Sequence, residues 1–341
     1  MKPFIYTIAL LVFSTPYLHA QARKFSYSEM KMGSPFNLII VSNDSNKANH
    51  LAQKSYELVD SLSHIFSNYD TSSELSKINA SAGLLPYKMS TAMLDLMQKS
   101  QDAYIQSKGA YDISIGPLSA LWRNARKSKL FPEASSVLST KKLVGFAQVK
   151  INKHLGTIFL PTFGMQLDFG GIAKGYIAGR IIDYLKTNGI LQALADAGGD
   201  IVMSGAPLNQ KDWLIGVNLP ETTDDLLNKK LQLSNCSVAT SGDVYQFIEY
   251  KGVKYSHIIN PMTGYGVTNL RNVTIIAKTG ASADWLATAC SILPIQEAKQ
   301  LALSHNAALL ITTLKNGKLV FESTPNFKNY WQTEGINQGK K

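Results

Sequence analysis

Short apolar runs of strand length alternate along this chain with longer segments that carry apolar residues at helical spacing. A run of four to six apolar residues favours a strand, whereas apolar residues three and four apart favour an amphipathic helix. The interleaving predicts an α/β (α+β) fold in which mixed sheets are flanked by helices. The expected strands are 36–41, 201–203, 213–217 and 273–277, and the expected helices are 46–66, 91–107, 172–185 and 281–293.

Local signals mark two further elements and one buried stripe. Ser72 and Ser73 are good helix caps, and Glu74 beside them suits the positive end of a helix, so a helix should begin there. Residues 307–322 predict a hairpin, because Asn316-Gly317 accepts positive φ at both centres of a type I′ turn. The buried stripe of the helix 46–66 is expected to be Leu51, Leu58, Leu62 and Ile65.

The number of domains follows from length and from what is missing between the elements. A chain of 341 residues allows two domains, but it has no repeat of 20–50 residues and no Pro/Ser-rich linker. We therefore expect one large domain. With 45% hydrophobic and 17% charged residues the chain is not of the disordered or collagen-like class. Cys236 and Cys290 are too few to staple it, and we expect ordinary buried thiols; a disulfide between them after export is the alternative.

The first 22 residues are typical of a secretory signal peptide. Lys2 gives the positive start, an apolar run follows from Phe4 to Phe13, and Ala20 and Ala22 offer small-residue cleavage sites. The alternative is a buried N-terminal strand or helix. We predict a signal peptide over 1–22, a domain over 23–330 and a polar tail over 331–341. The mature protein is then expected to be exported and soluble, in a bacterial periplasm.

Charge and hydropathy limit the partners. The net charge of +10 is spread along the chain, which suits anionic ligands but does not indicate nucleic acid, and no nucleic-acid partner is expected. No later stretch of 18 or more apolar residues occurs, so no transmembrane segment is expected.

One segment departs from plain packing at the start of the helix 172–185. Gly170-Gly171 precedes this helix, and paired glycines let a ligand approach free backbone N–H groups that favour phosphate. Lys174 in the first turn has the wrong charge for a helix start, which a bound phosphate would explain. The glycine spacing matches neither a Walker A loop nor the dinucleotide fingerprint, and turn chemistry alone is the alternative.

Two other segments carry groups suited to chemistry. Asp284 and Thr288 are four apart and so share a helix face, where their oxygens suit Mg²⁺ rather than Zn²⁺. The alternative is a surface Asp with a Thr bonded to its own helix. His257 precedes a turn with Pro261 and Gly264, a position suited to a general base, although a structural histidine has the same appearance.

The order of these segments resembles the ApbE-type FAD:protein FMN transferases, from about Met32 to Thr313. The blocks that carry the resemblance are MGSPF (32–36), SNYDTSSELSKIN (67–79), GAYDISIGPLSALW (109–122), LDFGGIAKGY (167–176), ADAGGDI (195–201), VATSGD (238–243), HIINPMTG (257–264) and ADWLATA (283–289). The resemblance implies an ApbE-like fold and Mg²⁺-dependent transfer of FMN from FAD to a Thr or Ser of an exported or membrane flavoprotein, with release of AMP.

The resemblance also implies roles for particular residues. Asp284 and Thr288 would hold Mg²⁺ through side-chain oxygens, and Gly171 through its backbone carbonyl. His257 is the candidate that takes the proton of the acceptor hydroxyl. The positions matched to FAD binding are Met32, Tyr69, Ala110, Tyr111, Asp112, Lys174, Ser241, Gly242 and Ile258. For Met32 and Tyr111 a place in the core is an equally good interpretation.

Two departures and three alternative functions remain. Asn260 and Met262 stand where the family often has Asp and Arg, so no charge role is expected of that turn. Gly179 stands where Asp is frequent and should loosen its helix. The alternatives to transfer are a Mg²⁺-dependent FAD pyrophosphatase giving FMN and AMP, a non-catalytic periplasmic FAD-binding protein, and an exported domain without flavin.

Overall fold

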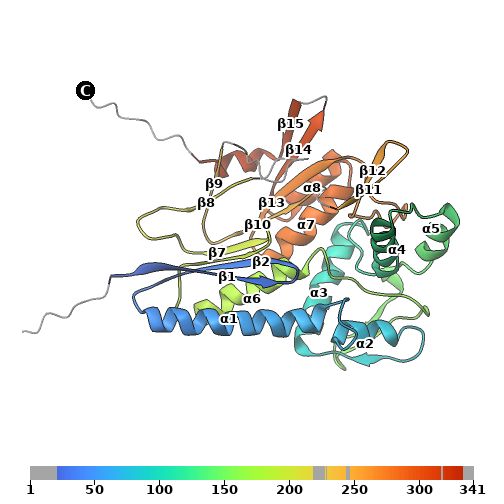
Figure 1. Ribbon diagram of the computed structural model, residues 1–341, viewed down its shortest axis with the longest axis horizontal. Helices are drawn as coiled ribbons and strands as arrows, with labels where there is room; N and C mark the ends of the chain where they lie inside the picture. The colour runs from blue at the N-terminus through green and yellow to red at the C-terminus, as the bar shows by residue number, and fades with distance from the viewer. Residues whose placement is uncertain (1–20, 218–226, 228, 243–245, 316–317, 333–341) are drawn as a thin grey trace, which may run out of the picture.

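The computed structural model describes residues 21–217, 227, 229–242, 246–315 and 318–332 (Figure 1). All of the predicted signal peptide except Gln21 and Ala22 lies outside these residues, as does the Asn316-Gly317 turn. Among the described residues, no helix is long and apolar enough to cross a membrane. Trp331 and Gln332, from the expected tail, are described: Gln332 donates its backbone N–H to the Lys230 carbonyl, and the Trp331 ring meets the edge of Phe327.

The described chain is organised around an eight-stranded sheet in which every neighbouring pair of strands is antiparallel. In spatial order its strands are β1 (Arg23–Lys31), β2 (Ser34–Ser42), β6 (Ala193–Ala197), β7 (Ile201–Ser204), β10 (Ser237–Ser241), β13 (Arg271–Ala277), β14 (Ala308–Lys315) and β15 (Lys318–Ser323). The smaller sheets contain β3 (Tyr87–Lys88), β5 (Thr157–Phe159) and β4 (Lys150–Asn152), then β8 (Trp213–Ile215) with β9 (Leu231–Leu233), and β11 (Phe247–Tyr250) with β12 (Val253–Ser256).

Helices cover one face of the large sheet and the ends of the molecule. They are α1 (Ser45–Phe66), α2 (Glu74–Ala80), α3 (Thr91–Gln106), α4 (Gly116–Ser128), α5 (Ala134–Lys141), α6 (Ala173–Thr187), α7 (Gly280–Ile292) and α8 (Ile295–Ser304), with the 3₁₀ turns η1 (Phe146–Gln148) and η2 (Pro325–Tyr330). In Figure 1, α1 and α6 lie below β1, β2 and β7, while β8 and β9 lie on the opposite side.

The central strands are buried on both faces, and alternate residues enter different cores. Ile275 packs with the helices α1, α3, α6 and α7, whereas its neighbour Ile276 packs with β8, β9 and η2. Likewise, Leu309 packs in the core under the helices and Leu310 in the core with β8, β9 and η2. This follows from the two-residue period of a strand. A third cluster joins α4, α5 and β11 around Trp122 at the end of the molecule.

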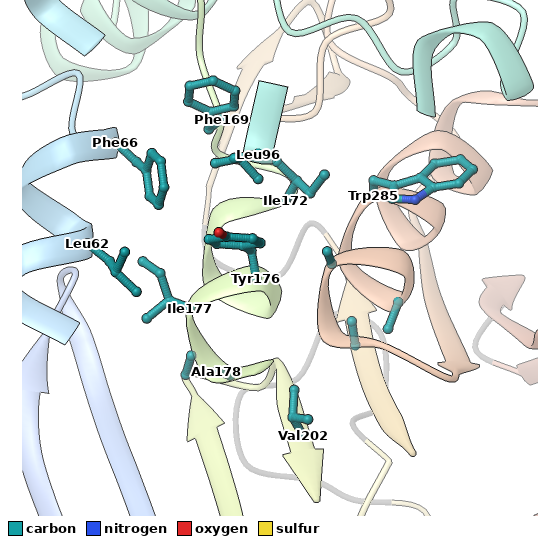
Figure 2. Packing of buried hydrophobic residues seen from close by; sticks show 14 of the residues in the cluster. Leu62, Phe66, Leu96, Phe169, Ile172, Tyr176, Ile177, Ala178, Val202 and Trp285 are labelled. Atoms are coloured by element: carbon teal, nitrogen blue, oxygen red, sulfur yellow. The ribbon is translucent and has the colours of Figure 1, made fainter. Parts of the chain in front are cut away.

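The helix α6 packs closely against both the sheet and α7. The strand β6 faces it with small side chains at Ala193, Ala195 and Ala197, so the helix axis can approach the sheet. Figure 2 shows Tyr176 and Ile177 of α6 facing α1, with Trp285 of α7 on the other side. The Tyr176 ring meets the edge of Phe66 at a centroid distance of 5.6 Å.

The mixed α/β architecture predicted from sequence is confirmed, and the predicted helices start and end within a few residues of the observed ones. Within α1 the buried stripe differs from the expected one: Leu51 and Leu62 are buried, but Leu58 and Ile65 lie at its margin. Tyr56 and Val59 lie on the buried stripe instead. A helix has 3.6 residues per turn, so residues spaced by seven, such as Leu51, Leu58 and Ile65, move gradually away from its buried face. The two thiols are unpaired; Cys290 is buried, as expected, whereas Cys236 is only half-buried.

The crossing of α6 and α7 yields a stability prediction. A Cβ on Gly280 would lie 2.0 Å from the Gly175 carbonyl oxygen and 2.6 Å from Val202 Cγ2. Gly280→Ala must therefore separate the helices, and we expect the free energy of unfolding to fall by about 2 kcal/mol or more. Denaturant unfolding followed by circular dichroism measures this.

The matched control is Gly179→Ala on α6, where an added Cβ meets no atom within 4 Å. Alanine there should raise the free energy of unfolding by about 1 kcal/mol, because glycine is the poorer helix former. If Gly280→Ala is as stable as the parent protein, the close crossing is not required.

Candidate functional site

Three residues of α7, each one turn after the last, face the start of α6. Gly280 touches the backbone of Gly175, as described above. Asp284 Oδ2 accepts the backbone N–H of Gly175 at 3.0 Å. One turn further, Thr288 Oγ1 lies only 2.6 Å from where a Cβ on Gly171 would stand. The structure thus brings Gly171 together with Asp284 and Thr288, although more than a hundred residues separate Gly171 from the other two.

Asp284 replaces the missing cap of α6. The N-cap residue Ile172 has no side-chain oxygen to offer, and Gly175 N–H belongs to the unsatisfied first turn. The carboxylate of Asp284 bonds that N–H across the helix–helix contact and also suits the positive end of the helix dipole. Among the described residues this is the only hydrogen bond made by the carboxylate, so its other oxygen retains its capacity to bind a ligand.

Lys174 lies in the first turn of α6, and its side chain reaches the Gly198-Gly199 turn. Its Nζ is 3.4 Å from where a Cβ on Gly198 would stand, so only glycine leaves this space open. Ser34 Oγ lies under the same glycine, at 2.4 Å from that Cβ position, and it is buried without a hydrogen-bond partner in the described structure. Met32 lies in the β1–β2 turn, two residues before Ser34. Met32 and Gly33 are the two turn residues of this hairpin, and both have positive φ, of 52° and 76°.

The acidic groups of this region resist ionisation together. Burial raises the pKa of Asp284 to about 7, and the Gly175 N–H and Lys174 only partly offset it. Burial also raises the pKa of Asp200, and the nearby charge of Asp284 raises it further. Asp284 is buried and Asp200 is half-buried, and two neighbouring carboxyl groups of this kind accept a cation readily, because a positive charge relieves both effects.

The donor set suits a magnesium ion. No group of three or more His, Cys, Asp or Glu residues that could hold a metal occurs in the described parts of the chain. Mg²⁺ needs fewer protein ligands than that, since it is commonly held by one or two carboxylates and completed by water and substrate phosphates. The carboxylate of Asp284, the hydroxyl of Thr288 and the carbonyl of Gly171 are all hard oxygen donors on adjoining backbone. These residues therefore fit the metal that the resemblance implies.

His257 follows β12 and is held with a neutral ring. Burial lowers its pKa to about 4, and the positive charges of Arg126 and Lys174 lower it further, against the backbone of Gln246, which raises it. Its Nδ1 is buried without a hydrogen-bond partner among the described residues. An imidazole in this state is uncharged across the physiological range and can accept a proton.

Tyr69 is the most exposed of the predicted flavin contacts, with 77% of its surface accessible. The guanidinium of Arg123 covers the ring at 4.3 Å from its centroid. Arg123 Nη2 also lies 3.8 Å from Asp168 Oδ2, and Asp168 Oδ1 accepts the Gly170 N–H at 2.8 Å. The tyrosine is therefore connected to the glycine pair at the start of α6.

The segment 110–112 lies mostly inside the protein. Asp112 accepts the N–H and the hydroxyl of Ser114 at 2.7 and 2.6 Å and the N–H of Phe146 at 3.3 Å, so its carboxylate holds the loop. Tyr111 is 4% exposed and its ring packs near that of Trp285, at 6.2 Å between centroids. Ala110 is also buried. Of the two interpretations of Tyr111, the core is the one it occupies here.

The remaining predicted positions lie on separate elements of the fold. Ser241 ends β10 opposite Val273, and Gly242 follows it where a Cβ would lie 2.1 Å from Asn272 Oδ1. Ile258 is buried and accepts the Val267 N–H through its carbonyl. Met32 packs at the edge of the main core.

Several residues of this region were not singled out from the sequence. They are Ser34, Arg123, Arg126 and Asp168. Arg126 lies one turn after Arg123 on α4, and burial together with the neighbouring Arg123 lowers its pKa. The signal available for the pair was its spacing of three, which puts both side chains on one helix face. Nothing in the sequence showed which face points at His257.

Comparison with known proteins gives consistent matches over most of the chain. The model of the ApbE family matches residues 32–311. The chain is 32% identical to an FAD:protein FMN transferase of Klebsiella pneumoniae over 263 residues, covering 77% of this chain and 80% of that protein. It is 29% identical to one of Treponema pallidum over 289 residues, covering 80% of each. The flavin transferase ApbE from Vibrio cholerae shares the fold, with a TM-score of 0.80 at 24% identity, covering 91% of this chain and 100% of that one.

Gly171→Ala tests whether Gly171 and Thr288 serve one metal. The new Cβ would displace the Thr288 hydroxyl, which lies 2.6 Å from its position. We expect binding of Mn²⁺, a spectroscopic substitute for Mg²⁺, to weaken about tenfold or more in the presence of FAD, measured by electron paramagnetic resonance. Gly170→Ala is the neighbouring control, since its Cβ would approach only Asp168 Oδ1, at 3.1 Å. Equal Mn²⁺ affinity in both variants would contradict the assignment.

Proposed function

The chain belongs to the ApbE family, and on this premise we propose that it transfers the FMN half of FAD to a Thr or Ser hydroxyl of an acceptor flavoprotein, using Mg²⁺ and releasing AMP. The observation that carries the proposal is the meeting of Gly171, Lys174, Asp284 and Thr288 at the start of α6. Hard oxygen donors and a lysine at one place suit a metal-bound diphosphate. The signal-like segment 1–22 supports the further proposal that this happens after export, in a periplasm.

The chain's own residues bind and orient the nucleotide. Lys174 supplies positive charge beside the diphosphate, and its Nζ lies next to the Gly198 turn. Tyr69 offers an exposed ring face on which a flavin or adenine ring stacks. Asp284, Thr288 and the Gly171 carbonyl would hold Mg²⁺, which when bound supplies positive charge to the diphosphate oxygens and so favours departure of AMP.

The transfer itself is a single displacement at phosphorus. The acceptor hydroxyl oxygen forms a bond to the phosphorus of the FMN half, and the bond from that phosphorus to the bridging diphosphate oxygen breaks. The electron pair of the broken bond leaves with AMP, and the hydroxyl proton goes to the imidazole of His257. A neutral imidazole in hydrogen-bond reach typically accelerates such a step by about 10²–10⁴-fold.

The test is incubation of the exported protein with FAD, Mg²⁺ and a candidate acceptor flavoprotein, followed by intact-mass analysis of the acceptor. We expect the acceptor to gain one FMN in phosphoester linkage, and the label to disappear when the target Thr is replaced by Val. Asp284→Asn should give no label, because it removes the charge that holds the metal. Free FMN and AMP with an unlabelled acceptor would instead establish FAD hydrolysis, and unchanged bound FAD would establish a binding protein.

The pH dependence of transfer tests His257. Because its pKa is lowered to about 4, by burial and by Arg126 and Lys174, the ring stays neutral as the pH falls through 6.5. With Mg²⁺ saturating, so that Asp284 stays ionised although burial raises its pKa to about 7, we expect kcat to stay level from pH 9 down to about 5 and to fall only near pH 4. An ordinary histidine would lose half its base form near 6.5. Steady-state kinetics over this range measures it.

His257→Ala should lower kcat by about 10²-fold or more and leave the KM for FAD nearly unchanged. His154→Ala is the control, since His154 is exposed on the β4–β5 turn. A normal kcat in His257→Ala over the whole pH range would remove His257 from the mechanism.

A further inference from the structure

The exposed ring of Tyr69 belongs to a loop that is itself firmly held. Its backbone N–H bonds to Ser67 Oγ at 3.1 Å, and Ser73 Oγ donates to the Ser67 carbonyl at 2.6 Å. Ser76 Oγ donates to the Asp70 carbonyl at 2.7 Å. The loop is therefore short and cross-linked, so it presents the Tyr69 ring to solvent from a fixed backbone, as a preorganised ligand contact requires.

One face of that ring is already covered. The Arg123 guanidinium lies 4.3 Å from the ring centroid, which is within cation–π range. Because Tyr69 remains 77% exposed, the opposite face is open to a planar ligand. The Arg123 side chain is only partly exposed, so solvent screens its contact with Tyr69 less than it would screen a fully exposed pair.

Arg123 is fixed on its other side to the start of α6. Its Nη2 is 3.8 Å from Asp168 Oδ2, and the Asp168 side chain is largely buried. Asp168 in turn accepts the Gly170 N–H and donates its backbone N–H to the Ile113 carbonyl at 2.7 Å. The next residue after Gly170 is Gly171, which faces Thr288. A continuous set of contacts therefore runs from the exposed ring to the candidate metal site.

We propose that Arg123 is a positioning residue that holds the Tyr69 ring at a set distance from the Gly170-Gly171 turn, so that the aromatic ring system and the diphosphate of one nucleotide bind together. This inference rests on the proposed function, since it takes FAD as the ligand. Ordering the ring before binding reduces the conformational entropy lost on binding, so removal of Arg123 weakens binding rather than chemistry. Arg123 acts through Tyr69 and does not itself touch the reacting atoms.

The experiment is a double-mutant cycle on FAD binding in the full exported protein. The dissociation constant of FAD with Mg²⁺ is measured by the quenching of flavin fluorescence on stacking, for the parent, Arg123→Ala, Tyr69→Ala and the double variant. We expect each single variant to bind about tenfold more weakly and the double variant to bind no more weakly than Tyr69→Ala alone, because the arginine has no effect without the ring. In Arg123→Ala the KM for FAD should rise while kcat changes less than twofold.

Two controls separate this role from charge and from folding. Lys127→Ala removes an equal charge from an exposed position of the same helix and should bind FAD as the parent does. Arg123→Lys should recover only part of the affinity, because an ammonium lacks the planar guanidinium that stacks on the ring. Thermal unfolding of all variants checks that the fold is intact.

The possible outcomes test the role of Arg123 separately from the proposed transfer of FMN. If the parent protein neither binds FAD nor labels an acceptor, the proposed function is wrong. If the parent does both, but Arg123→Ala binds FAD as tightly as Lys127→Ala, Arg123 has no positioning role. A double variant weakened by the product of the two single effects would also overturn the proposal, because Arg123 would then act independently of Tyr69.

Discussion

The close contact between α6 and α7 is the constraint on which the rest of this structure depends. Gly175 and Gly280 meet backbone to backbone, a distance at which no side chain is tolerated. That approach puts Asp284 within hydrogen-bond reach of the first turn of α6 and puts Thr288 against Gly171. The small side chains of β6 allow the same helix to settle on the sheet. Packing and the candidate site therefore have a common origin.

Electrostatics explains why such a site needs ligands. Asp284 and Asp200 are carboxyl groups whose pKa values burial raises. Burial lowers the pKa of His257, and the nearby cations Arg126 and Lys174 add to this effect. A divalent cation would stabilise the two carboxylates, and an anionic diphosphate would stabilise the two cations. A metal-bound nucleotide brings both charges at once, which is the complement of what the protein presents.

The elements with strong periodicity could be predicted from the sequence, and so could the pairing of Asp284 with Thr288, because residues four apart share a helix face. Strand β6 could not, since its alternating alanines carry little hydrophobic signal and matter only through the helix above them. The charges of Arg123 and Asp168 are plain in the sequence, but their partnership with Tyr69 is a tertiary fact. For the segment 110–112 the resemblance predicted contacts with FAD. It did not reveal that the Asp112 carboxylate accepts hydrogen bonds from Ser114 and Phe146.

The hydrogen bond between Gly175 and Asp284 spans 109 positions of the chain. Contacts between residues so distant in sequence form late, because a long loop must first close. The residues of the candidate metal site thus cannot assemble until the last third of the polypeptide has been made and docked onto α6. A chain cut short before α7 would keep the glycine pair and the lysine but would have neither the carboxylate nor the hydroxyl, and so full-length synthesis is a built-in condition for activity.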